Sequence, residues 1–176
     1  RVRTHSDTQP GALYTGPLAV MVDGQSASAS EIFAGAIQDY KRGLIIGEPT
    51  FGKGTVQNLL PLSAYAQEQY KNKLGQLKIT IAQFFRINGD STQFRGVIPD
   101  IRWPVAESEE PFGERALDNA LPWRKIERSE YVTSQPQIRE DVLQQLRQRH
   151  QQRIDVSKDF SAALDKRRLL VEMRQE

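Results

Sequence analysis

The chain of 176 residues is long enough to bury one hydrophobic core with a helical appendage. Its 38% hydrophobic and 26% charged residues are ordinary values for a soluble globular protein, and a net charge of +2 does not indicate a nucleic-acid or membrane partner. No apolar run approaches the roughly 18 residues of a membrane span, and the absence of cysteine excludes disulfides, thiolate metal sites and cysteine nucleophiles.

The first part of the chain alternates between strand and helix patterns. After a polar loop at 1–16, the apolar run 18–22 ends at an Asp-Gly pair and predicts a short buried strand. Apolar residues then recur at helical spacing over about 28–40, and 44–46 predicts a second strand. A strand, a helix and a strand in this order form a β-α-β unit, so part of the sheet is predicted to be parallel.

The next segment is predicted to be extended and to add antiparallel pairing. Apolar residues alternate with others over 77–87, and the polar residues 63–75 are predicted to be an excursion between strands. The pair Asn88-Gly89 is a strong hairpin signal, so 91–97 is predicted to return as an antiparallel strand. These patterns favour an α/β fold with a mixed sheet.

The composition changes after residue 100. An acidic stretch with Pro and Gly predicts a linker and packing segment at 105–135. Helical periodicity predicts one helix around 138–146 and another over 160–173, which together make 136–176 a helical C-terminal region. Because the chain starts without Met and ends in a helix without a cap, we expect it to be a truncated piece of a longer protein.

Two segments concentrate residues that carry chemistry. The first, Ser-Ala-Ser-Ala-Ser-Glu at 26–31, lies where a strand passes into a helix, so Ser28 sits beside unpaired N–H groups that suit an oxyanion. Ser28 and Glu31 also match a capping box, which begins many helices without any catalysis. From this segment alone, the cap is the favoured interpretation.

The second segment runs from Gly47 to Thr55 and contains Gly52-Lys53-Gly54. Its spacing is close to that of a phosphate-binding loop, which predicts a nucleotide site. Such a loop needs Ser or Thr directly after the lysine and a helix that begins there. Here a glycine follows Lys53 and the next residues are extended, so a surface Gly-Lys-Gly turn is the simpler alternative.

A serine nucleophile needs a base, and the two segments together supply one. The two histidines, His5 and His150, lie near the ends of the chain outside any motif, and both are predicted to be surface residues. A Ser-His-Asp triad therefore has little support. A lysine can replace histidine when an apolar site keeps it neutral, and Lys53 with a glycine on either side fits such a site.

Six motifs lie along roughly the first 130 residues: SASASEI at 26–32, Asp-Tyr at 39–40, TFGKGTVQ at 50–57, FFRING at 84–89, GVIPDI at 96–101 and DNALPW at 118–123. Together they resemble the motifs of the C-terminal processing (tail-specific) serine proteases. The last motif is similar to that of the large periplasmic tail-specific proteases of Gram-negative bacteria.

The resemblance implies a crotonase/ClpP-like α/β protease core with a mixed sheet, here 1–104. It implies a Ser-Lys dyad, with Ser28 as nucleophile and Lys53 as general base, and an acyl-enzyme formed without metal or cofactor. The glutamine four residues past the lysine, Gln57, orients it; a straight strand would separate the two by about 13 Å, so the chain must bend there.

Two further residues are assigned by position in the motifs. The Ala29 N–H is expected to donate to the oxyanion, and the other oxyanion donor is expected upstream of the chain. Asp39, about three helical turns beyond Ser28, matches a functionally implicated aspartate. The alternative for Asp39, a solvated charge on a helix, is at least as well supported.

The resemblance also implies partners and a compartment. A PDZ domain that recognises the free carboxylate of a substrate's tail is expected upstream, and the substrates are proteins with unstructured or nonpolar C-terminal tails. An adaptor lipoprotein is a further expected partner, and the location is the periplasm. Two rival functions remain: a non-catalytic interaction module in which Ser28 only caps its helix, and a nucleotide-binding protein that uses Gly47 to Lys53.

Overall fold

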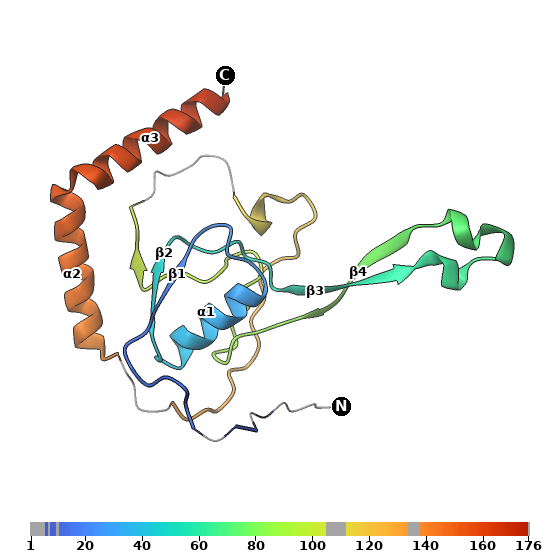
Figure 1. The fold of residues 1–176 in the computed structure, drawn as a ribbon, viewed down its shortest axis with the longest axis horizontal. Helices are drawn as coiled ribbons and strands as arrows, with labels where there is room; N and C mark the ends of the chain where they lie inside the picture. Colours follow the sequence, from blue (N-terminus) through green and yellow to red (C-terminus); the bar gives the residue numbers. More distant parts are fainter. Residues whose placement is uncertain (1–5, 7, 10, 105–111, 134–137, 176) are drawn as a thin grey trace.

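A small parallel sheet forms the centre of the molecule in this computed structural model, which describes residues 6, 8–9, 11–104, 112–133 and 138–175. Strand β1 (Ala19–Val22), helix α1 (Ala29–Asp39) and strand β2 (Leu44–Gly47) follow one another (Figure 1). The two strands pair in parallel, with Ala19 opposite Leu44 and Val22 opposite Gly47. The predicted β-α-β unit is therefore confirmed.

Strand β5 (Ile101–Arg102) adds to β2 in parallel, which gives the sheet the order β1-β2-β5. On the α1 side of this sheet, Ala34 packs with Val22, Ile45 and Val97 in a core that excludes water. This core is small, and it fixes the orientation of α1 against the sheet. The start of α1 thereby keeps a constant position relative to the carboxyl end of β1.

Helix α2 (Glu140–Val156) packs against β5, and α3 (Lys158–Gln175) then turns away from the core (Figure 1). Both predicted C-terminal helices are confirmed, as is the α/β core with a helical C-terminal region. Between α2 and the sheet lies a cavity of about 250 Å³ lined by Leu44, Ile46, Ile101, Trp103, Leu146, His150, Arg153 and Phe160. Among the described helices, none combines the length and the hydrophobicity that a membrane span requires.

The prediction of a surface His150 is wrong, because the residue is only 8% exposed. Its ring bonds the Arg102 carbonyl through Nε2 at 2.9 Å and packs edge-on against Phe160. The sequence of α2 is mostly polar, so its pattern does not indicate which face of the helix packs against β5. His5, the other predicted surface histidine, lies outside the described residues.

Strands β3 (Thr55–Pro61) and β4 (Gln76–Gln83) form a separate antiparallel ribbon that projects from the core (Figure 1). Two short 3₁₀ helices at its tip, Leu62–Tyr65 and Glu68–Lys73, make up the predicted excursion between strands. The ladder is irregular between Val56 and Gln57, close to the root of the ribbon. Parallel and antiparallel pairing thus both occur, but in two sheets.

The predicted return strand at 91–97 is wrong. Asn88 and Gly89 do form a turn, closed by the Arg86 N–H and the Asp90 carbonyl at 2.8 Å, but β4 pairs with β3 instead. Beyond the turn, Phe94 and Gly96 have positive φ angles of 71° and 69°, which are incompatible with a strand.

Hydrogen bonds of buried polar side chains fix the position of residues 91–97, which form no backbone bonds to any described strand. Gln93 bonds the Gly54 N–H, the Glu114 carboxylate and the Leu121 carbonyl at 2.9, 2.9 and 3.1 Å. The Trp123 indole donates to the Ser91 carbonyl at 3.0 Å. Residues 114–123, which begin with the 3₁₀ helix Glu114–Ala116, therefore bond the 91–97 loop, and Gln93 of that loop bonds the Gly-Lys-Gly segment at Gly54.

Candidate active site

Ser28 lies at the junction between the turn that follows β1 and the first residue of α1. Its backbone has φ 58° and ψ −113°, a conformation that favours glycine and strains any residue with a Cβ. Strained backbone of this kind persists only where the surrounding structure holds it, and it clusters at functional sites. A serine on a sharp strand-to-helix turn is also the arrangement that exposes the nucleophile in α/β-hydrolases.

The predicted capping box is present, and Glu31 provides its better-defined half. The Glu31 carboxylate accepts the Ser28 N–H at 2.8 Å, which is the glutamate half of the box. The Glu31 N–H donates to the Ser28 carbonyl at 2.9 Å, a backbone bond of the first helical turn. Ala29 is the first residue of α1, and no described residue accepts its N–H. An unpaired donor at the positive end of the helix thus lies next to the serine.

The neighbouring Ser26 has a structural task. Its hydroxyl donates to the Asp23 carboxylate at 2.9 Å and accepts the Asp23 N–H at 3.1 Å, which closes the turn after β1. Its carbonyl accepts the Phe51 N–H at 3.0 Å. This last bond brings the second predicted segment alongside the first.

Glu31 joins the two segments more firmly. Its side chain is fully buried, and besides the Ser28 N–H it accepts the Thr50 hydroxyl at 2.6 Å, the Gly52 N–H at 2.7 Å and the Lys53 N–H at 2.9 Å. The Ser28 and Lys53 amides bond the same oxygen, Oε2. The structure therefore holds the backbones of Ser28 and Lys53 on one carboxylate oxygen.

Replacing Glu31 with alanine should lower the free energy of unfolding by about 3–5 kcal/mol, because four donors lose a buried charged acceptor. Urea unfolding of the two proteins measures this difference. The matched control is Glu172→Ala on the exposed face of α3, which should change stability by no more than about 0.5 kcal/mol. A Glu31→Ala loss below about 1 kcal/mol would show that other groups hold the segments together.

The two glycines beside Lys53 allow close backbone approach. Gly52 has φ 95°, and a Cβ there would lie 3.0 Å from the Phe94 carbonyl carbon, while a Cβ on Gly54 would lie 2.5 Å from the Gln93 nitrogen. Strand β3, not a helix, follows the lysine. The segment therefore lacks the arrangement of a phosphate-binding loop.

The side chain of Lys53 is half-buried, and its ammonium donates to the Thr55 carbonyl at 3.1 Å. Gln57, on β3, is exposed, and the structure shows no hydrogen bond between the Lys53 and Gln57 side chains. The predicted pairing of these two side chains is therefore not formed here. Within the described ranges, no three His, Asp or Glu side chains are grouped to hold a metal ion.

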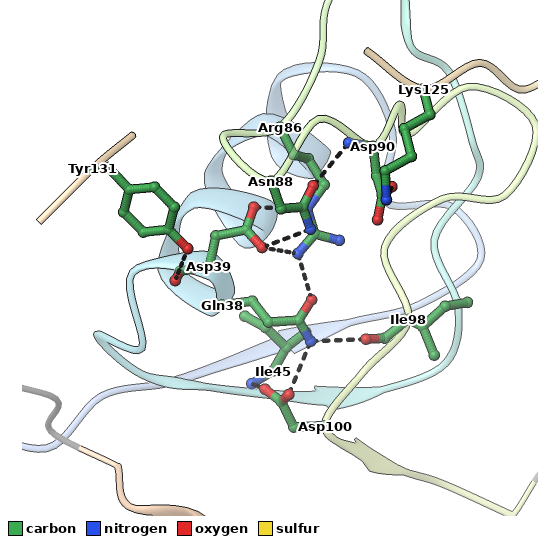
Figure 2. Close-up of polar contacts among 10 residues, drawn as sticks. All are labelled: Gln38, Asp39, Ile45, Arg86, Asn88, Asp90, Ile98, Asp100, Lys125 and Tyr131. Atoms are coloured by element: carbon green, nitrogen blue, oxygen red, sulfur yellow. Dashed lines mark hydrogen bonds and ion pairs between the residues drawn. The ribbon is translucent and has the colours of Figure 1, made fainter. Parts of the chain in front are cut away.

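Asp39 lies at the far end of α1 from Ser28, in a network of its own (Figure 2). Its carboxylate accepts hydrogen bonds from Arg86 Nη2 at 2.6 Å and Arg86 Nε at 2.8 Å, and from Asn88 Nδ2 at 3.3 Å. The Asp39 side chain is only 7% exposed, so the alternative of a solvated charge is wrong. The partners come from the FFRING motif, which the sequence analysis used only for its resemblance.

The same network anchors the end of α1 to the loop before β5. Gln38 donates to the Ile98 carbonyl and to Asp100, each at 2.9 Å, and Asp100 accepts the Ile45 N–H at 2.8 Å (Figure 2). Both ends of α1 are thus tied by buried carboxylates, Glu31 at the start and Asp39 at the end. The first of these is the end that holds the candidate dyad.

Comparison with known proteins adds the family. The sequence profile of peptidase family S41 matches residues 1–103, which include the whole candidate site. The chain belongs to peptidase family S41. Residues 108–176 of this S41 chain match the C-terminal domain of tail-specific protease.

Curated relatives agree with this assignment. The tail-specific protease of Haemophilus influenzae is 48% identical over 132 residues, which are 75% of the S41 chain and 19% of that protein. The carboxy-terminal-processing protease of Bartonella bacilliformis is 45% identical over 105 residues, or 60% of the chain and 21% of the relative. The S41 chain therefore spans about a fifth of the length of these relatives.

Solved structures with similarity include a photosystem II D1 C-terminal processing protease and mature CPAF. The first has a TM-score of 0.41 and 42% identity over 49% of the S41 chain and 20% of its own. The second has a TM-score of 0.45 and 24% identity over 55% of the S41 chain and 17% of its own.

Proposed function

We propose that the protein containing this chain is a serine endopeptidase of the C-terminal processing type, with Ser28 as nucleophile and Lys53 as general base. The observation that carries the proposal is the shared carboxylate oxygen of Glu31, which holds a strained Ser28 and the backbone of Lys53 side by side. Membership of family S41 supports the reaction class.

In the proposed reaction, the Ser28 hydroxyl attacks the peptide carbonyl while a neutral Lys53 amine takes its proton. The Ala29 N–H stabilises the oxyanion, and the amine leaves with the proton that the lysine returns. Water then hydrolyses the acyl-enzyme. In this structure the Lys53 ammonium bonds the Thr55 carbonyl, so the reaction requires its flexible side chain to turn toward Ser28 while the backbone stays fixed.

The finer parts of the proposal follow the resemblance. Substrates are proteins with unstructured or nonpolar C-terminal tails, recognised through a PDZ domain elsewhere in the protein, with an adaptor lipoprotein as a further partner. The location is the periplasm. Gln57 orients Lys53 in the active arrangement, and Asp39 supports the site through its anchoring of α1.

An acylating probe tests the covalent step. The intact protein is mixed with the p-nitrophenyl ester of a short peptide that has apolar C-terminal residues, quenched with acid and analysed by mass spectrometry. We expect the peptide that carries Ser28 to gain the mass of the acyl group in the wild type and in Ser30→Ala, but not in Ser28→Ala. Absence of the adduct from the wild type would favour the non-catalytic interaction module.

A further inference from the structure

Among the residues that the structure describes, no strand other than β4 pairs with β3, so the second edge of β3 is open next to the candidate dyad. The Phe84 N–H donates to the Gly54 carbonyl at 3.0 Å, and the Leu62 N–H donates to the Gly75 carbonyl at 3.1 Å. At the irregularity, Val56 lies opposite Ala82 and Gln57 opposite Thr80, so the extra residue is in β4 and the alternation along β3 is unbroken. The two bonds therefore direct the even-numbered residues of β3 toward β4. The odd-numbered residues direct their N–H and C=O groups away from β4, toward the open edge.

This edge is blocked over its outer part. The outward N–H of Leu59 is accepted by the side chain of Asn58 at 2.9 Å, and Pro61 has no N–H. Capping groups and proline are the devices by which proteins prevent unwanted strand pairing. On the inner part, the Thr55 carbonyl is bonded by the Lys53 ammonium, whereas the N–H and carbonyl of Gln57 face outward with no such block, and Gln57 is exposed.

The unblocked part is also the part nearest the candidate base. Lys53 precedes β3 by two residues, and its ammonium bonds the carbonyl of Thr55, the first residue of the strand. A peptide backbone paired with Gln57 would therefore lie directly beside the Lys53 side chain. The blocked positions, Leu59 and Pro61, come later in β3, toward the 3₁₀ helix that begins at Leu62.

We propose that the substrate binds as an added β-strand on the inner edge of β3, with the backbone N–H and carbonyl of Gln57 as its main contacts. This inference rests on the proposed function and specifies the substrate class. Main-chain pairing requires a segment that is already extended and unfolded, and it tolerates many side chains. The blocks at Leu59 and Pro61 limit the pairing to a few residues around the cleaved bond.

The kinetic test uses proline substitutions in the intact protein and a fluorogenic peptide with an apolar C-terminal tail. Gln57→Pro removes an outward N–H without loss of a bond to β4, and should raise KM about five- to tenfold, as expected for one lost hydrogen bond. The matched control Leu59→Pro removes an N–H that Asn58 already satisfies, and should leave KM within about twofold. Gln57→Ala retains the N–H, so its effect should fall on kcat.

A second arm does not depend on catalysis. Hydrogen exchange is measured for single amides of Ser28→Ala, with and without a saturating unlabelled tail peptide. We expect the Gln57 amide to exchange at least tenfold more slowly with the peptide, and the Leu59 amide to be unchanged. If Ser28→Ala retains turnover, the proposed nucleophile is wrong, but protection of Gln57 would still support strand addition.

Three results would overturn the inference. One is an unchanged Gln57 amide at saturating peptide, and another is an equal rise in KM for both proline variants. The third is a fall in melting temperature in Gln57→Pro of 5 °C or more beyond that in Leu59→Pro. That fall would mean that another part of the protein already pairs with this edge.

Discussion

Replacing Ser28 with glycine is expected to stabilise the protein while it abolishes peptidase activity. The serine backbone lies at φ 58° and ψ −113°, where a Cβ costs on the order of 1–3 kcal/mol, and glycine carries no such cost. The loss of the serine cap reduces this gain in stability by only a few tenths of a kcal/mol, because glycine is tolerated at an N-cap. Urea unfolding and peptide turnover of the intact protein measure the two effects together.

The alanine variant separates strain from chemistry. Ser28→Ala retains the Cβ and therefore the strain. Its free energy of unfolding should fall by about 1 kcal/mol, because alanine cannot cap the helix. Its turnover should fall on the order of 10⁴-fold or more, because the attacking atom is gone. A Ser28→Ala enzyme that retains more than a few per cent of wild-type turnover would overturn the assignment of the nucleophile.

The choice of control serine follows from the hydrogen bonds. Ser30→Ala is the matched control, since this exposed serine lies in the same helical turn and should retain full activity and stability. Ser26→Ala is unsuitable, because it would open the turn that the Ser26 hydroxyl closes with Asp23. Loss of stability in Ser26→Ala would therefore say nothing about catalysis.

Lys53→Arg is expected to be as inactive as Lys53→Ala, with kcat/KM on the order of 10³-fold or more below the wild type. A guanidinium stays charged at any workable pH, so it cannot take a proton from Ser28. The backbone bond from residue 53 to Glu31 is retained in both variants, so neither should unfold. Steady-state kinetics and thermal melting of the intact protein measure both quantities.

The control for this pair is Lys78→Arg on the exposed face of β4, which should leave activity unchanged. Substantial activity in Lys53→Arg would mean that position 53 contributes only positive charge. The dyad mechanism would then be wrong, although membership of family S41 would stand.

The elements that local periodicity determines could be predicted from the sequence. The strand, helix and strand around α1 and both C-terminal helices have apolar residues at the spacing of their own secondary structure, and all are confirmed. The strand partner of β4 could not be predicted in the same way. An Asn-Gly pair specifies a turn, but which strand pairs with which depends on contacts that are distant in the sequence.

In the candidate site, too, the residues in local motifs could be predicted from the sequence, whereas the contacts between distant segments could not. Ser28 and Lys53 were recognised from motifs, and Glu31 was predicted only as a helix cap. Its bonds to Thr50, Gly52 and Lys53 reach across some 20 residues of sequence, and no spacing rule describes them. The burial of Asp39 and His150 was missed for the same reason, since Arg86 and Arg102 lie nearly 50 residues away from their partners.

Because the one carboxylate of Glu31 bonds both the Ser28 turn and the Gly52-Lys53 segment, local opening of either is coupled to opening of the other. If the Gly52-Lys53 segment lifts away, Glu31 is left as a buried charge with fewer donors, and the turn at Ser28 loses the partner that holds its strain. The two segments therefore share one opening free energy, although they are far apart in the chain. We therefore expect the Ser28 turn and the Gly52-Lys53 segment to open together, with an intermediate in which only one of them is in place scarcely populated.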